Sequence, residues 1–167
     1  MGGSPLQLAE RLRSEGEKTC QFFDGLSGDH WEQVVYTEGS GWRVWQILAH
    51  FVASEASLRK LVENILAGGP GSSEDFDLNR YNESKVRKLG AIPVEELLRQ
   101  FRELRRDNVE FVSVMQVADL EKTGRHPFLG MARLEDIIKL IYRHNQIHQR
   151  EIRKALAQAG DVDLSTG

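Results

Sequence analysis

Apolar residues recur at helical spacing in four long segments of the chain, which cover residues 5–26, 42–67, 93–116 and 134–159. Glycine-rich or polar stretches separate these segments. Neither an internal repeat nor the apolar–polar alternation of a strand stands out between them. The pattern predicts an all-α protein, a four-helix bundle in which each helix turns an apolar stripe inward.

Residues at the segment ends agree with these helices. Ser4 is placed to cap the first helix ahead of a proline, and Pro93 with two glutamates behind it suits the start of another. Gly160 is predicted to end the last helix. Polar residues over 72–77 predict an exposed loop, and a shorter helix is predicted over 78–89.

Length and composition narrow the class of protein. The 167 residues, of which 40% are hydrophobic, predict one domain over 1–167 with a folded core over about 5–159. A net charge of −3 argues against nucleic-acid binding, and we interpret the basic run 102–106 as a solvated helix face. No apolar run approaches the ~20 residues that span a bilayer, so we expect a cytoplasmic protein without a membrane partner. Cys20 is the only cysteine, which excludes a disulfide within the chain and a thiolate zinc site.

Two of the five histidines, His144 and His148, lie four residues apart in the last segment, and this spacing places both on one helix face. At about 100° per residue that face is the apolar one, which also carries Leu134, Ile137, Ile141, Ile152 and Ala155. Burying two imidazoles without partners is costly, whereas one shared divalent ion satisfies both. We therefore predict that the pair binds one metal ion.

A third ligand has to come from another helix, and His50 is the candidate. It lies in the second segment, at the edge of the apolar stripe that contains Ile47. This position suits a residue near the mouth of a cleft, and by itself it does not decide between a ligand and a packing role. His30 and His126 stand in polar or turn-rich stretches, and we interpret both as surface or loop histidines.

Other metal motifs are not matched. The run 144–148 lacks the glutamate that zincins place after the first histidine, and the Glu-x-x-His pairs of di-iron bundles are absent. A mononuclear three-histidine site with open positions for water or substrate is therefore the better-supported geometry, and it is compatible with Zn, Ni, Fe or Mn. The alternative is a metal-free bundle with three buried histidines.

The histidine-bearing segments resemble a known family. Residues 41–51, GWRVWQILAHF, are similar to the tryptophan-led second helix of the DinB-like proteins, the DNA-damage-inducible, YfiT-like four-helix bundles. Residues 126–130, HPFLG, and 142–148, YRHNQIH, are similar to the last loop and last helix of that family. Residues 79–82 resemble its middle section, and the resemblance covers about residues 6–156.

The resemblance implies one divalent metal ion bound by three histidines, which by position are His50, His144 and His148. It also implies frequent homodimers. Characterised relatives are thiol S-transferases that use low-molecular-weight thiols, mycothiol-dependent isomerases, and hydrolases of reactive electrophiles. We therefore expect a metal-dependent hydrolase or thiol transferase in stress response or detoxification, with a small electrophilic substrate and, for transfer, a low-molecular-weight thiol as a second cofactor. The alternative is a non-catalytic, metal-dependent protein that binds a small molecule.

No other side chain is predicted as a catalytic residue. Glu55 and Glu151 lie within a turn or so of the expected ligands, and we interpret both as surface carboxylates. Trp42 and Trp45 begin the second helix, where they either line the pocket or, as we expect, pack in the core or an interface. The polar loop 68–77 is placed to lie beside the opening of the site.

Overall fold

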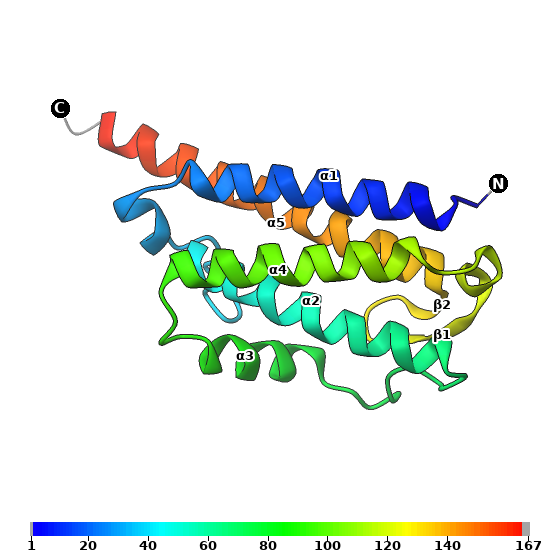
Figure 1. The fold of residues 1–167 in the computed structure, drawn as a ribbon. Coiled ribbons are helices and arrows are strands. Elements are labelled where there is room, and N and C mark those ends of the chain that lie inside the picture. Colours follow the sequence, from blue (N-terminus) through cyan, green and yellow to red (C-terminus); the bar gives the residue numbers. More distant parts are fainter. Residues whose placement is uncertain (1, 165–167) are drawn as a thin grey trace.

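A computed structural model describes residues 2–164, and its four long helices form the predicted bundle (Figure 1). They are α1 (Pro5–Asp24), α2 (Val44–Leu66), α4 (Val94–Ser113) and α5 (Leu134–Leu164). The shorter helix α3 (Leu78–Lys88) also agrees with its prediction, and 3₁₀ turns at Gly28–Glu32 and Val117–Glu121 lie in the connections. None of the helices within residues 2–164 is long and apolar enough to cross a bilayer.

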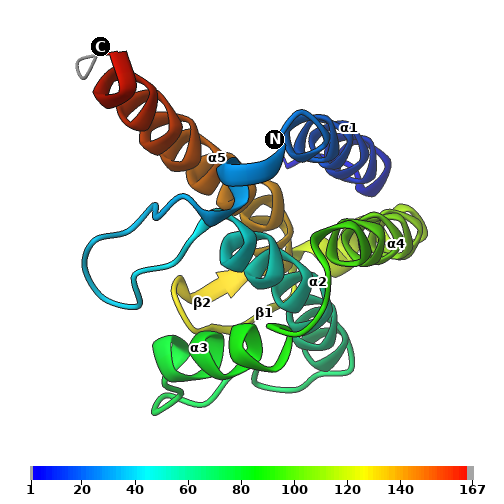
Figure 2. The ribbon, with the colours of Figure 1, turned by 90° about the vertical axis from the view of Figure 1, so that its left-hand side faces the viewer.

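The order of the helices around the bundle differs from their order in the chain. The first helix, α1, packs against α4 and α5, and α2 packs against the same two helices, so α1 and α2 occupy opposite corners (Figure 2). The connection 25–43 therefore crosses an end of the bundle and passes beside α5. The helix α3 lies outside the bundle and packs on α2.

The structure confirms one of the predicted helix ends and contradicts another. The Ser4 hydroxyl accepts a hydrogen bond from the Gln7 backbone N–H, and the Gln7 side chain accepts one from the Ser4 backbone N–H, so the predicted cap is present as a capping box. The prediction that Gly160 ends the last helix is wrong, because α5 continues to Leu164. Gly160 is not among the glycines with positive φ, and a glycine in right-handed helix geometry costs only about 1 kcal/mol.

A two-stranded antiparallel sheet is an addition to the predicted all-α architecture. Strands β1 (Thr123–His126) and β2 (Gly130–Arg133) are four residues long, too short to show an alternating pattern in the sequence. The hairpin is joined to the loop after α2, because the Arg125 backbone N–H donates to the Pro70 carbonyl and the Ser72 N–H donates to the Arg125 carbonyl, both at 2.8 Å. Gly71 passes so close to Arg125 that a Cβ there would lie 2.4 Å from its carbonyl oxygen. These contacts fix where β1 ends.

The core is divided at mid-height by a layer of buried polar side chains. One apolar cluster contains Phe23, Phe51 and Phe101, and the other contains Leu12 and Ile137. Between them along the four long helices lie the members of the polar layer, which are Glu15, Thr19, Glu55, Arg105, Asn108, Asn145 and Gln149. The bundle therefore has two apolar halves and a polar middle rather than one continuous apolar core.

Candidate metal centre

Three histidines meet where α2 faces α5. His50 comes from α2, and His144 and His148 come from successive turns of α5. The Nε2 atom of His144 lies 2.9 Å from Nε2 of His50 and 2.9 Å from Nε2 of His148. One ligand atom from each residue lies within 4.8 Å of the others. The structure therefore brings together the three side chains predicted as metal ligands.

The three rings are largely withdrawn from water, and this keeps them neutral. Burial lowers the pKa of His144 to about 4 and, together with the neighbouring His144, lowers the pKa of His148 to about 3. Burial and the other two histidines hold the pKa of His50 well below its ordinary value. Because the neutral imidazole is the form that binds a metal, the cluster can accept an ion at neutral pH without first losing protons.

Hydrogen bonds alone do not satisfy this cluster. A neutral imidazole carries one N–H and one lone pair. The Nε2 atom of His144 faces two other Nε2 atoms, so as a donor it serves only one of them, and as an acceptor it offers one lone pair to both. Within residues 2–160, Nδ1 of His50 is also buried without a partner. An ion with bonds of about 2.0–2.1 Å would use all three inward lone pairs, so the donor set fits a divalent metal.

A tyrosine in the connection before α2 holds the outer side of His148. The Tyr36 hydroxyl lies 2.5 Å from Nδ1 of His148 and donates to the carboxylate of Glu151. Once its proton is directed to Glu151, the Tyr36 oxygen accepts from the Nδ1–H of His148, which leaves the Nε2 lone pair facing the other histidines. Burial raises the pKa of the Glu151 carboxyl, which is partly exposed. Tyr36 could not be predicted from the sequence, because a tyrosine in a loop carries no periodic signal.

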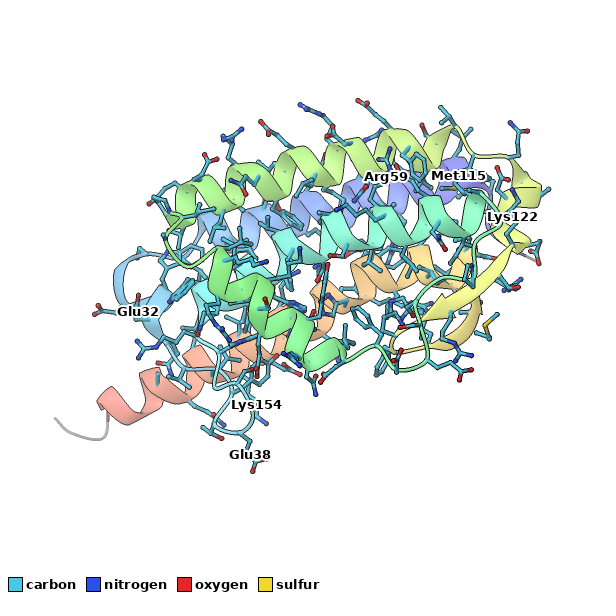
Figure 3. All side chains as sticks on the ribbon, turned by 90° about the horizontal axis from the view of Figure 1, so that it is seen from below. Glu32, Glu38, Arg59, Met115, Lys122 and Lys154 are labelled. Carbon is cyan, nitrogen blue, oxygen red and sulfur yellow. The ribbon has the colours of Figure 1, made fainter. Side chains whose placement is uncertain are left out.

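The cluster forms part of the wall of a cavity of about 730 Å³. The other walls come from α3, the hairpin and the connection before α2, and Figure 3 looks onto this face, with Glu38 at the tip of the connection. Trp42 lines the cavity and packs on His50 with ring centroids 4.9 Å apart, whereas Trp45 lies outside the lining. The loop 68–77 borders the cavity, as predicted.

The interpretation of Glu55 and Arg105 as surface residues is wrong. They are 1% and 4% exposed, and Nε of Arg105 lies 3.1 and 3.2 Å from the two carboxylate oxygens of Glu55. Asn108 donates to the same carboxylate at 2.8 Å, and Arg105 donates to the side-chain oxygen of Asn145 at 2.5 Å. Since Asn145 adjoins His144 in α5, this network sets the height of the ligand-bearing helix against α2.

The two remaining histidines differ from each other. His30 is exposed, as predicted, and its Nδ1 accepts a hydrogen bond from the Ser27 backbone N–H at 3.2 Å. His126 is only 7% exposed and lines the cavity, so its interpretation as a surface or loop histidine is wrong. The reason is long-range: the hairpin folds against the loop 68–77, a contact on which the polar residues around His126 in the sequence carry no information.

The profile of the DinB superfamily matches residues 11–152, a span that contains all three clustered histidines. The chain belongs to the DinB superfamily. This confirms the resemblance seen in the histidine-bearing segments, and it makes the three-histidine cluster a feature of a DinB superfamily member rather than of an isolated helical bundle.

Two solved structures are similar to this DinB superfamily member. YfiT from Bacillus subtilis, described as a probable metal-dependent hydrolase with an unusual four-helix bundle topology, matches with a TM-score of 0.72 at 15% identity, over 93% of this chain and 86% of YfiT. An uncharacterised protein from Clostridium difficile 630 matches with a TM-score of 0.68 at 15% identity, over 92% of this chain and 96% of that one. A search of curated proteins gives no significant match. At these identities the likeness establishes the fold.

Proposed function

We propose that this DinB superfamily member is a metal-dependent enzyme that acts on a small electrophilic molecule, as a hydrolase or as a thiol S-transferase. The observation that carries the proposal is the convergence of three imidazole Nε2 atoms on the wall of a cavity of about 730 Å³. A structural metal site is closed by four protein ligands, whereas three ligands beside a cavity leave room for a reactant. The description of YfiT as a probable metal-dependent hydrolase is consistent with this function.

In this proposal His50, His144 and His148 hold one divalent ion, for which Zn, Ni, Fe and Mn are all suitable. When bound, the ion supplies a Lewis acid for water or for a thiol, because three neutral ligands leave it its full charge. The surrounding wall is mainly apolar and selects a small molecule with apolar groups over a highly charged one. Its apolar members include Leu58, Leu61, Phe76, Phe128 and Leu140.

Tyr36 and Glu151 form an acid–base pair next to the cluster. Tyr36 lines the cavity, and Glu151 lies behind it, in contact with the Tyr36 hydroxyl. A carboxyl whose pKa is raised by burial is suited to take up a proton closer to neutral pH. We infer that the pair orients His148 and can pass a proton from the cavity toward solvent.

The first test combines metal analysis with turnover. Protein purified without a nickel column is assayed for hydrolysis of an activated aryl ester, and for transfer with a small thiol and an activated aryl halide, before and after chelation. We expect about one divalent ion per chain, and activity that is lost in His148→Ala while the bundle stays folded. His30→Ala is the matched control, because His30 is exposed and lies outside the cavity.

Two results would contradict the proposed enzymatic function. Much less than one ion per chain in both wild type and His30→Ala would argue for a metal-free bundle. A bound ion without turnover of either substrate, together with melting of His148→Ala, would favour a non-catalytic protein that binds a small molecule around a structural metal. The homodimer implied by the family resemblance remains a prediction, which light scattering on the same samples tests.

A further inference from the structure

The cavity contains a fourth histidine whose role differs from that of the other three. His126 ends β1, immediately before the tight turn that leads into β2. Its Nδ1 accepts hydrogen bonds from the backbone N–H groups of Phe128, at 3.0 Å, and Leu129, at 3.2 Å. The imidazole thus replaces a backbone carbonyl as the acceptor inside the turn, in the way that Asn and Asp side chains often do.

These two hydrogen bonds determine the tautomer of His126. A nitrogen that accepts two N–H groups must present a lone pair, so the proton of the neutral ring is on Nε2. Protonating Nδ1 would place a third N–H against the two backbone donors. Burial also lowers the pKa of His126 to about 4, which keeps the ring neutral at physiological pH. His126 therefore carries an Nε2–H and has no lone pair available for a metal ion.

The Nε2–H has no acceptor among the described residues. Among residues 2–160 no protein group pairs with this atom, yet it is not among the polar atoms sealed from solvent without a partner. The ring is only 7% exposed and belongs to the cavity wall, and we infer that the Nε2–H faces the cavity. The pairing of Arg125 with the loop at Pro70 and Ser72 holds the end of β1 in place, so the donor is fixed before a ligand arrives.

We propose that His126 is a substrate-binding residue that donates its Nε2–H to a carbonyl oxygen of the ligand, an inference that rests on the proposed function of the same cavity. The ligand class is a neutral carbonyl compound, such as an ester or a ketone, with an apolar group that fits the apolar wall. The four histidines then divide into two kinds: His50, His144 and His148 present lone pairs to a metal ion, and His126 presents a proton to the substrate.

The tautomer is tested first, by ¹⁵N NMR of histidine-labelled full-length protein in EDTA, with His126→Asn used to assign the signals. We expect an Nδ1 of His126 without a proton and an Nε2 with one, unchanged between about pH 6 and 8. A proton on Nδ1, or titration of this ring with a pKa near 6.5, would overturn the proposal. Neither result depends on metal content or turnover, so the proposed function can fail separately.

The donor role is tested by a binding cycle with acetophenone and with α-methylstyrene, which has the same shape but no carbonyl oxygen. His126→Phe removes the donor and keeps a ring. His126→Asn keeps an acceptor for the turn, but its side chain is too short to place a donor where Nε2 of His126 lies. We expect both variants to weaken acetophenone binding by about threefold to tenfold and to leave α-methylstyrene binding unchanged. Equal losses for the two probes would show that His126 donates no hydrogen bond to the ligand. No saturable acetophenone binding by the wild type would overturn the proposed ligand class.

Discussion

Two buried polar clusters lie next to each other in the middle of the bundle, and they are built in opposite ways. In the first, the Arg105 guanidinium meets the Glu55 carboxylate, and Asn108 and Asn145 occupy further donor and acceptor positions. In the second, the histidine cluster, nitrogen faces nitrogen at 2.9 Å, and Nδ1 of His50 has no partner within residues 2–160. The same two helices, α2 and α5, contribute to both clusters.

In the proposed function, this difference separates a structural role from a functional one. A buried network whose donors and acceptors match can register the helices against one another and needs no ligand. Convergent imidazole nitrogens beside a cavity are only partly satisfied by hydrogen bonds among themselves, and one metal ion would use all their inward lone pairs. The first cluster holds α5 at the height that the second cluster requires, because Asn145 and His144 are neighbours in the chain.

The largest expected effect is a loss of stability at acid pH, which acts through the histidine cluster. In metal-free protein the folded-state pKa values of His144 and His148 are about 4 and 3, below the ordinary value near 6.5. The unfolded chain therefore binds more protons between pH 6.5 and 4, so stability is complete above pH 6.5 and falls as the pH is lowered through this window. At about 1.4 kcal/mol per unit for each group, we expect a loss on the order of 5 kcal/mol by pH 4.5.

Urea denaturation in EDTA at a series of pH values measures this loss. His144→Leu is the informative variant, since it removes one depressed group. Its free energy of unfolding should fall less steeply with pH, by about 1.4 kcal/mol per unit. A wild-type free energy that stays level from pH 6.5 to 4.5 would show that the cluster is not held neutral.

Removing the cation of the first cluster should have the next largest effect. Arg105→Met leaves the Glu55 carboxylate buried without its partner, and we expect a loss of about 3–5 kcal/mol in the free energy of unfolding. Arg102→Met is the matched control on the same helix, because Arg102 pairs with Asp24 at the surface and should change stability by less than about 1 kcal/mol. Similar losses for the two variants would mean that the buried pair has no special role.

Tyr36→Phe should have the smallest effect of the three and should act on the metal rather than on the fold. Without the hydroxyl, His148 loses the acceptor that orients it, and we expect metal affinity to fall by about 10-fold to 100-fold. Competition with a chromogenic chelator measures the change. Tyr81→Phe is the control, because Tyr81 lines the same cavity but bonds to Ser57. Equal metal affinities of the wild type and both variants would show that Tyr36 does not support metal binding.

Periodicity was enough to predict the helices and the inward histidine pair, because both depend on spacing within one helix. The burial of Glu55 and Arg105 could, in principle, also be predicted from the sequence. Each stands four residues after a core phenylalanine, Phe51 or Phe101, and so interrupts an apolar stripe. Each charge considered alone predicts a solvated side chain, whereas two charges at core positions on different helices indicate a buried pair.

The residues that sequence analysis missed depend on contacts between distant segments. Tyr36 reaches His148 only because the connection 25–43 crosses the end of the bundle and passes α5. His126 is buried only because a short hairpin pairs with the loop after α2. Helical periodicity describes one element at a time and cannot show how such loops fold back. Spacing predicted the pair His144 and His148, and the family resemblance added His50. The groups around the histidine cluster could not be predicted from the sequence.

The position of α3 also determines which parts of the cavity can vary in sequence. This helix covers part of the cavity, but among its residues only Val86 is buried, and it packs outside the ring of four helices. Most of its positions can therefore vary without disturbing the helices that carry the three clustered histidines. In the proposed function, substrate selectivity and metal binding would therefore reside in separable parts of the chain.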